Sequence, residues 1–221
     1  ETYHHLSLNK SGTTFTASGT LNITGVFTIN SGTFNAGSNT INLNGGGTPF
    51  VVNGDFASQS STISYRGTSA TNILSIEYYN LVVGNINLAS SVTYTSQVGT
   101  IDVLGYFSLG FTSGSEAIFD ADTNNTAINV TGIFSIDAIS ARFEASSNSA
   151  SPLTLLNNFL NYDGVFYHNG GKVIMGSGVD STQRISGSNS FYDLEITGGD
   201  RVFTFAQNTN TVIDNNGSLN L

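Results

Sequence analysis

Residues 101–107 read Ile-Asp-Val-Leu-Gly-Tyr-Phe, and residues 128–134 read Ile-Asn-Val-Thr-Gly-Ile-Phe. In both stretches two apolar residues alternate with other residues and are followed by glycine and then, two positions later, by phenylalanine. Alternation with a period of two is typical of a β-strand that buries one face. The pattern recurs at residues 21–27, 50–56 and 153–159, with Asn in place of Gly in the last copy. The chain is therefore predicted to repeat a strand-forming unit.

A longer similarity overlies this short pattern. An aromatic-rich opening occurs at residues 3–8, 78–83 and 191–196. Each copy leads through a stretch of threonine and aromatic residues into a pair of small residues and another alternating strand. We interpret the three openings as the beginnings of three related modules.

The chain is accordingly predicted to be a single array with internal modules. Residues 3–77 and 78–190 form two full modules, and residues 191–221 form a truncated third one. In this alignment Leu221 corresponds to Ile23, so the sequence stops partway through a repeat. We expect either that the chain is a piece of a longer protein or that this end stacks against another subunit.

The composition predicts an ordered protein that is almost entirely β. Asn, Gly, Ser and Thr supply 106 of the 221 residues, whereas charged residues supply 10%. The residues that favour helices are therefore too scarce to form long amphipathic helices. The chain is nevertheless 38% hydrophobic, with 15 Phe and 9 Tyr, which is enough apolar surface to oppose disorder.

Short strands separated by Asn-Gly and Gly-rich turns predict a parallel β-solenoid (β-helix) of about eight or nine coils. Inward Leu, Ile, Val and Phe would form a dry stack, and Asn residues at the turns could form hydrogen-bonded ladders. A β-sandwich is an alternative, because the Asn-Gly pairs at Asn44, Asn53 and Asn216 also suit hairpins. A β-propeller fits the spacing less well, because its blades need roughly 40–45 residues.

Three motifs resemble the repeats of large bacterial surface proteins. They are the aromatic-Tyr-x-Leu opening, the Gly-Thr-Leu-x-Ile-x-Gly-x-Phe strand of residues 19–27, and the Thr-Gln-x-Ile sequence of residues 182–185. Repeats of this style are similar to the β-helices of filamentous haemagglutinin and autotransporter passenger domains. The resemblance implies an extracellular or cell-surface protein, often adhesive or filament-forming, and it carries over no catalytic residue.

Charge and residue content exclude several classes of partner. The net charge is −9, and the 6 basic residues are scattered along the chain, so we expect no nucleic acid and no anionic membrane surface as a partner. No apolar run is long enough to span a bilayer, so membrane insertion is not expected. With no cysteine, neither disulfides nor thiolate metal sites can form.

The leading functional hypothesis is a structural, extracellular building block that stacks end to end, with itself or with neighbouring modules. A terminal coil exposes unpaired backbone groups and an apolar disc. The residues expected to carry the assembly are those of the end strands: Leu6, Leu8, Leu219 and Leu221.

The second hypothesis is a carbohydrate-binding adhesin. Exposed aromatic rings can stack on sugar rings, and Asn and Asp side chains can bond to the hydroxyl groups. The candidate contacts are Tyr78 and Tyr79 in one pair and Phe191 and Tyr192 in the other. Because consecutive strand residues face opposite ways, one member of each pair is expected to lie outside.

No enzymatic activity is expected, because no repeated carboxylate cluster is present. Asp193 and Glu195 could share a strand face, but the equivalent positions elsewhere carry no common chemistry, so we interpret them as solvated residues. No cofactor is expected. Asp120 and Asp122 begin an Asp-x-Asp-x-Asn stretch like the start of a calcium loop, for which a polar turn is the preferred interpretation and a structural Ca²⁺ the alternative.

Overall fold

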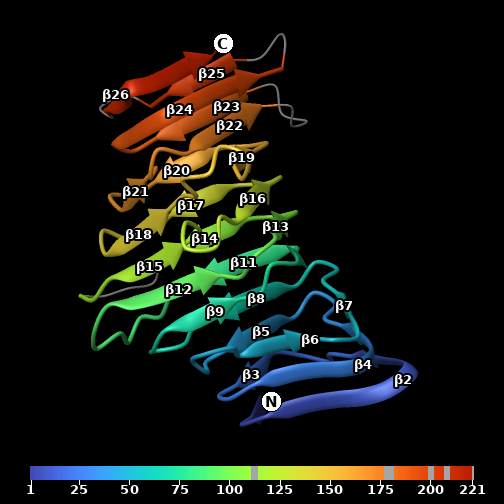
Figure 1. The fold of residues 1–221 in the computed structure, drawn as a ribbon. Coiled ribbons are helices and arrows are strands. Elements are labelled where there is room, and N and C mark those ends of the chain that lie inside the picture. Colours follow the sequence, from blue (N-terminus) through green and yellow to red (C-terminus); the bar gives the residue numbers. More distant parts are fainter. Residues whose placement is uncertain (111–113, 177–181, 199–201, 207–209, 221) are drawn as a thin grey trace.

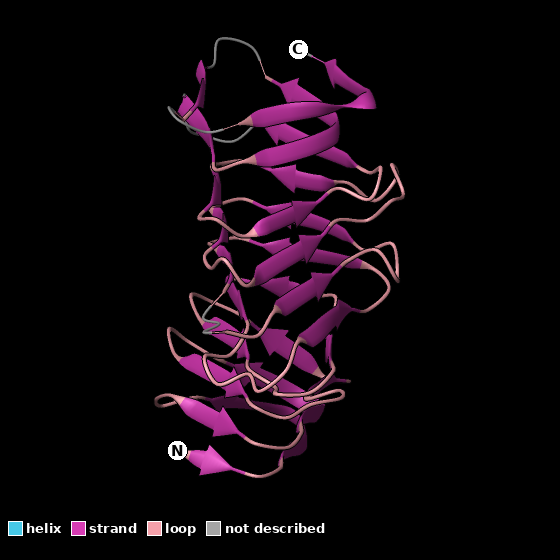
Figure 2. Ribbon diagram, turned by 90° about the vertical axis from the view of Figure 1, so that its left-hand side faces the viewer, coloured by secondary structure: helices cyan, strands magenta, loops and turns pink. Residues whose placement is uncertain are grey.

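The chain forms a stack of β-coils in the computed structural model, which describes residues 1–110, 114–176, 182–198, 202–206 and 210–220. Within these residues there are 26 strands and no helix, and hence no helix able to cross a membrane. Every assigned strand pair is parallel. Figures 1 and 2 show the coils rising from the N-terminus at one end to the C-terminus at the other. The predicted all-β parallel solenoid is confirmed.

A ten-stranded sheet runs the whole length of the stack, with one strand from each coil, and its ten strands mark about nine turns. The predicted number of coils is thus confirmed. In order, the strands are β1 (Thr2–Tyr3), β3 (Leu21–Ile23), β5 (Thr40–Leu43), β8 (Thr62–Tyr65), β11 (Asn80–Val83), β14 (Phe107–Leu109), β17 (Phe134–Ile136), β20 (Phe159–Asn161), β23 (Thr182–Ser186) and β25 (Val202–Phe205).

Two sheets complete the upper part of the solenoid. The five-stranded sheet has the order β21 (Val165–Tyr167), β18 (Ala141–Glu144), β15 (Ala117–Asp120), β12 (Val92–Ser96) and β9 (Thr71–Ile73). The seven-stranded sheet has the order β10 (Glu77–Tyr78), β13 (Thr100–Val103), β16 (Ala127–Val130), β19 (Leu153–Leu155), β22 (Lys172–Gly176), β24 (Asn189–Thr197) and β26 (Thr211–Asn220).

The lower part has a different cross-section. There the ten-stranded sheet faces a four-stranded sheet, formed by β2 (Leu6–Thr16), β4 (Phe27–Asn35), β6 (Phe50–Val52) and β7 (Asp55–Ala57), in which β6 and β7 both pair with β4. A coil advances 20 residues at the N-terminal end, where Tyr3 pairs with Ile23, and 27 residues in the middle, where Phe107 pairs with Phe134.

Columns of phenylalanine fill the interior and explain why the sequence motif ends in Phe. Phe107 and Phe134 lie one above the other with ring centroids 5.1 Å apart, as do Phe119 and Phe143. The two columns meet edge to face, for example at 4.9 Å between Phe134 and Phe143. These are the arrangements that aromatic quadrupoles favour. The phenylalanine rings of each coil therefore pack on the rings of the coil before it.

The glycine of the motif allows the corners of neighbouring coils to touch. A Cβ atom at Gly132 would lie 1.9 Å from the carbonyl oxygen of Gly105 in the coil below, and one at Gly45, which follows a strand outside the motif copies, would lie 2.3 Å from that of the motif glycine Gly25. Neither glycine has a positive φ, so the requirement is space rather than backbone freedom.

Asparagine side chains tie the coils together, as predicted for this composition. Asn42 Nδ2 donates to Asn22 Oδ1 at 2.8 Å on the outer face of the ten-stranded sheet. At the turns, Asn124 Nδ2 donates to the carbonyl oxygen of Ser96 at 2.7 Å and Asn169 Nδ2 to that of Ala145 at 2.8 Å. Most of these amides satisfy a backbone carbonyl of the preceding coil rather than another Asn.

A buried tyrosine network marks the level at which the cross-section changes. Tyr78 donates to the carbonyl oxygen of Leu74 at 2.6 Å, and Tyr65 accepts from the Leu74 amide at 3.2 Å. The two hydroxyl oxygens are 3.0 Å apart, so Tyr65 donates to Tyr78. Burial raises the pKa of Tyr65 to about 12 and that of Tyr78 well above its usual value. The network therefore stays protonated over the whole neutral range.

The coil, rather than the longer sequence module, is the structural unit. The three module openings lie at different places: Tyr3 belongs to the ten-stranded sheet, whereas Tyr78 and Phe191 belong to the seven-stranded sheet. Leu219 pairs with Leu194 in the seven-stranded sheet, whereas Leu21, its counterpart in the sequence alignment, lies in the ten-stranded sheet. The modules thus describe sequence similarity between strands that occupy different positions.

We predict that Gly132→Ala destabilises the fold. The added methyl group would meet the Gly105 carbonyl, so two coils must separate locally, at a cost of about 1–3 kcal/mol. This corresponds to a decrease in Tm of roughly 2–10 °C, measured by differential scanning calorimetry. The matched control is Gly19→Ala, because no atom lies within 4 Å of a Cβ there and its φ is not positive. Equal Tm values for the two variants would contradict the stacked-glycine explanation.

Candidate functional site

The outermost strands at the two ends of the solenoid are the first candidate site. At one end β1 and β2 are the last strands of their sheets, and at the other end β25 and β26 are. Figure 1 places β2 at the bottom of the stack and β25 and β26 at the top. Within the described part of the chain no further strand pairs with these edges, so their outward N–H and C=O groups face away from the stack.

Apolar side chains accompany the free edge at the N-terminal end. Tyr3, Leu6, Leu8 and Phe15 pack against the core but remain only partly buried. Their equivalents one coil further on, such as Phe27 and Ile29, are completely buried. The end residues are partly exposed because no coil of the described chain covers them, whereas Phe27 and Ile29 are covered by the next coil.

The C-terminal end is more exposed. Val202 is 60% exposed, and Phe205 and Leu219 are each 48% exposed. Leu219 lies on β26, as the assembly hypothesis requires, whereas Leu221 lies outside the described residues. Val202 and Phe205 were not among the predicted assembly residues, although the aromatic stretch at residues 203–205 includes Phe205. A hollow opens at this end, lined by Leu194, Phe205, Asn210, Thr211, Ile213 and Leu219.

At each end of the solenoid, the end coil and the coil next to it contain fewer and longer strands than the middle coils do. Each end coil combines one short strand with one long strand: β1 with the 11-residue β2, and β25 with the 10-residue β26. Both long strands show a register shift against their neighbours. Both end coils advance 20 residues, since Tyr3 pairs with Ile23 and Ile185 with Phe205, and the second coil does the same, since Ile23 pairs with Leu43. The middle coils instead contain three short strands.

The proposed glycan contacts divide by burial. Tyr78 and Phe191 are completely buried, so their assignment as glycan contacts is wrong. They belong to the core because their side chains point inward from the seven-stranded sheet, as alternation allows for one member of each pair. Tyr79 is 37% exposed and Tyr192 is half-buried. Contact between a glycan and these two residues stays a prediction.

Asp193 and Glu195 are both occupied by structural partners. The Asp193 carboxylate accepts hydrogen bonds from the amide and the hydroxyl of Ser218, at 3.0 and 2.8 Å. Glu195 Oε2 lies 2.8 Å from Lys172 Nζ, and this partner raises the pKa of Lys172. Both carboxylates therefore link successive coils.

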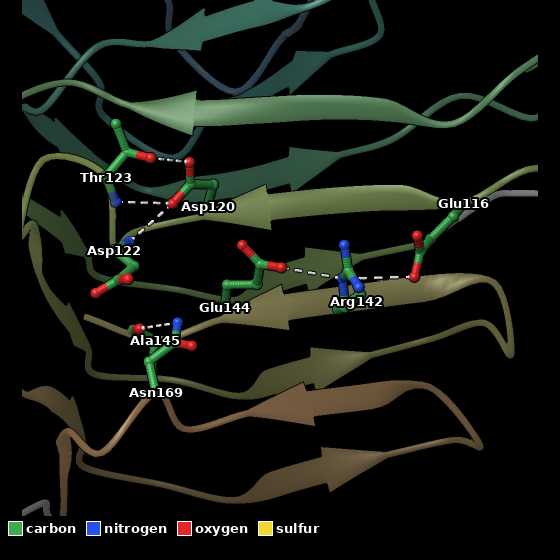
Figure 3. Close-up of polar contacts among 8 residues, drawn as sticks. All are labelled: Glu116, Asp120, Asp122, Thr123, Arg142, Glu144, Ala145 and Asn169. Atoms are coloured by element: carbon green, nitrogen blue, oxygen red, sulfur yellow. Dashed lines mark hydrogen bonds and ion pairs between the residues drawn. The ribbon is translucent and has the colours of Figure 1, made fainter. Parts of the chain in front are cut away.

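The Asp120 turn uses its carboxylate internally (Figure 3). Asp120 Oδ1 accepts from the amides of Asp122 and Thr123, both at 2.9 Å, and Oδ2 accepts from the Thr123 hydroxyl at 2.6 Å. Asp122 Oδ1 accepts from the Ser147 amide at 2.6 Å in the next coil. A polar turn accounts for these contacts, and a structural Ca²⁺ here stays an untested alternative.

Arg142 lies on the same surface between two glutamates (Figure 3). Its Nε is 3.1 Å from Glu144 Oε1 and 3.5 Å from Glu116 Oε1. Partial burial raises the pKa of Glu144, Arg142 acts in the opposite direction, and the nearby charges of Asp120, Asp122 and Glu116 raise it further. Arg142 is thus the cation that allows several acids to lie close together.

His168 packs between aromatic rings at the corner of the five-stranded sheet. Its ring stacks with those of Tyr167 and Tyr192, at centroid distances of 6.2 and 5.9 Å. Nδ1 accepts from the Gly170 amide, so the proton of the neutral ring sits on Nε2, which lies 3.4 Å from Asp214 Oδ2. Among the described residues no group of three or more His, Cys, Asp or Glu side chains is arranged to hold a metal ion.

Comparisons with known proteins identify no relative of this chain. No protein-family model, no curated protein and no solved structure matches the chain significantly. The chain is thus shown to be a β-solenoid repeat protein by its own geometry, and the resemblance to haemagglutinin-type repeats remains an expectation.

We predict that Arg142→Met makes stability more dependent on pH. A carboxyl whose pKa is raised by folding stabilises the folded state below its unfolded pKa and loses that contribution as pH rises through the folded pKa. Without Arg142 the pKa of Glu144 rises further, so the decrease in Tm relative to the native chain should be larger at pH 7 than at pH 4.

The control for this prediction is Arg184→Met, which removes the same charge from an exposed position. Its effect on Tm should change little between pH 4 and pH 7. A double variant, Arg142→Met with Glu144→Gln, should lose most of the extra pH dependence. Identical pH profiles for Arg142→Met and Arg184→Met would contradict the electrostatic account.

Proposed function

We propose that the protein is a structural β-solenoid rod that stacks head to tail with a second copy of the same fold. The observation that carries the proposal is the pair of end coils, which share one design and expose apolar residues beside free strand edges. An exposed parallel edge is a template for another strand, and solenoids commonly cover it with a cap.

The geometry of such a contact favours a filament. The N-terminal end coil meets the C-terminal end coil, so the two surfaces in contact differ. Contacts between unlike surfaces close into rings only if the rotation brings the chain of subunits back on itself, and otherwise they grow as open filaments. A rod whose ends lie at opposite poles of a straight stack, as in Figure 2, favours open growth.

The cellular setting follows as part of the proposal. The resemblance of the repeats to bacterial surface proteins supports an extracellular or cell-surface location, in a fibre or an adhesin stalk. The regular stack supports a role in spanning distance, because each coil adds about 4.8 Å to the rod. We infer no catalytic role, because Asp193, Glu195 and Asp120 all bond within the fold.

The proposal predicts that the double variant Phe205→Lys with Leu219→Lys abolishes assembly. Both side chains are half exposed at the C-terminal end and line its hollow, so two ammonium groups there would have to be desolvated on stacking. In sedimentation velocity the native chain should form oligomers whose size grows with concentration, and the variant should remain a monomer. Electron microscopy should show filaments of the native chain alone.

The matched control is Ile139→Lys, which places the same charge on an 80% exposed residue in a middle coil. It should assemble like the native chain. Circular dichroism should show the same β-signal for all three proteins, which separates loss of assembly from loss of fold. A native chain that stays monomeric at high concentration, or a Lys double variant that still forms filaments, would overturn the proposal.

A further inference from the structure

Two hollows on the outer face of the ten-stranded sheet share one wall. The first is lined by Tyr106, Ser108, Ile133, Ser135, Asp137, Leu160 and Tyr162. The second is lined by Thr40, Thr62, Ser64, Arg66, Val82 and Tyr106. Because Tyr106 lines both, the hollows adjoin along the long axis of the solenoid and together extend over the strands from β5 to β20; we call the two hollows together the groove.

The in-register stacking of coils creates this groove. Ser108 on β14 pairs with Ser135 on β17, and Ser135 pairs with Leu160 on β20. Side chains two residues apart share a face, so Tyr106 and Ile133 form an adjacent outward column, and Asp137 and Tyr162 form a third. Residues far apart in the sequence thereby line a single surface.

The aromatic and aliphatic side chains at the two edges are well exposed. Tyr106 is 40% and Tyr162 is 55% exposed, and Ile133 lies between them along the groove. Neither tyrosine takes part in the aromatic columns of the core. The exposed part of each ring is therefore available to a ligand, and a tyrosine also carries a hydroxyl group that can hydrogen-bond.

The edge that carries Tyr162 also holds a fixed carboxylate, that of Asp137. Asp137 Oδ2 accepts hydrogen bonds from the hydroxyl groups of Ser108, at 2.5 Å, and Ser135, at 3.0 Å. Both serines are buried, whereas Asp137 is exposed. The carboxylate is thus held from one side and has free acceptor positions on the other.

The second hollow adds hydroxyl groups and one cation. Thr62 Oγ1 lies 3.4 Å from the Tyr106 hydroxyl, and Thr40, Ser64 and Arg66 line the same wall. From β5 to β20 the groove crosses five strand spacings, which corresponds to about 24 Å. This length accommodates an extended oligomer rather than a single small molecule.

We propose that this groove binds a linear glycan, a polymer of neutral or N-acetylated hexoses lying along the solenoid axis. Tyrosine rings would stack on the apolar faces of sugar rings, and the alternating serine, threonine, Asp137 and Arg66 groups would bond to sugar hydroxyl groups. The inference goes beyond the proposed structural role, because it concerns the side of the rod and not its ends.

Other occupants fit the groove less well. An added peptide strand needs free backbone groups, but the ladder hydrogen bonds of these strands are already made within the sheet. A nucleic acid would be repelled by a chain of net charge −9. Arg66 is the one cationic side chain among the described lining residues, which is too few to bind a phosphate backbone. Asp137 is the one carboxylate among the lining residues that the structure describes, whereas glycoside hydrolysis needs a pair of acids. The groove is therefore proposed to bind a glycan and not to cleave it.

The test is a titration of the full chain with four linear hexasaccharides: those of cellulose, chitin, starch and mannan. Isothermal calorimetry should detect binding of at least one of them. Tyr106→Ala and Tyr162→Ala should each weaken that binding by about threefold to tenfold, and Asp137→Ala should weaken it further than Asp137→Asn does. The matched control is Tyr167→Ala, an equally exposed tyrosine on the five-stranded sheet, which should leave the affinity unchanged.

Two results would overturn the inference. One is the absence of binding by all four hexasaccharides, and the other is binding that Tyr106→Ala and Tyr162→Ala leave unchanged. If instead these variants alter sedimentation and no sugar binds, the groove is an interface between chains and the glycan assignment is wrong. Repeating the titration with the Phe205→Lys, Leu219→Lys double variant separates the two proposals, because glycan binding should survive the loss of end-to-end assembly.

Discussion

The backbone ladder between successive coils is the constraint on which the rest of the structure depends. Every strand of the ten-stranded sheet pairs in register with the strand of the next coil, so equivalent residues lie directly above one another. Interior coils have a neighbour on both sides, whereas the end coils have one. Stability, the exposed ends and the side groove all follow from this repetition, because a residue type that recurs in each coil becomes a column on the surface or in the core.

The stacking of coils also explains why Phe, Gly and Asn are abundant in the sequence. Phe recurs because stacked rings such as Phe107 and Phe134 fill the interior, and Gly recurs where corners touch, as Gly132 does with Gly105. Asn recurs because its amide reaches a carbonyl of the preceding coil. A protein built in this way needs few charges, and its Arg142 cluster is one place where opposite charges stabilise a surface.

The sequence was sufficient to predict the parallel solenoid and the number of coils, because the motif at residues 101–107 and 128–134 repeats at the true coil spacing. It was insufficient to place Tyr78 and Phe191, since alternation shows that one neighbour is buried without showing which. The groove was missed because its residues come from several coils, and registration of those coils is what brings them together. A usable signal existed: the residue between Gly and Phe in each motif, such as Tyr106, points outward.

Hydrogen–deuterium exchange as a function of protein concentration tests the central claim most directly. If the free edges of the end coils pair with another copy, the amides of β1, β2, β25 and β26 should become protected as concentration rises, while those of the middle strands, such as β14, should not change. The Phe205→Lys, Leu219→Lys double variant should show no such gain. Exchange in the end strands that is independent of concentration would contradict head-to-tail stacking.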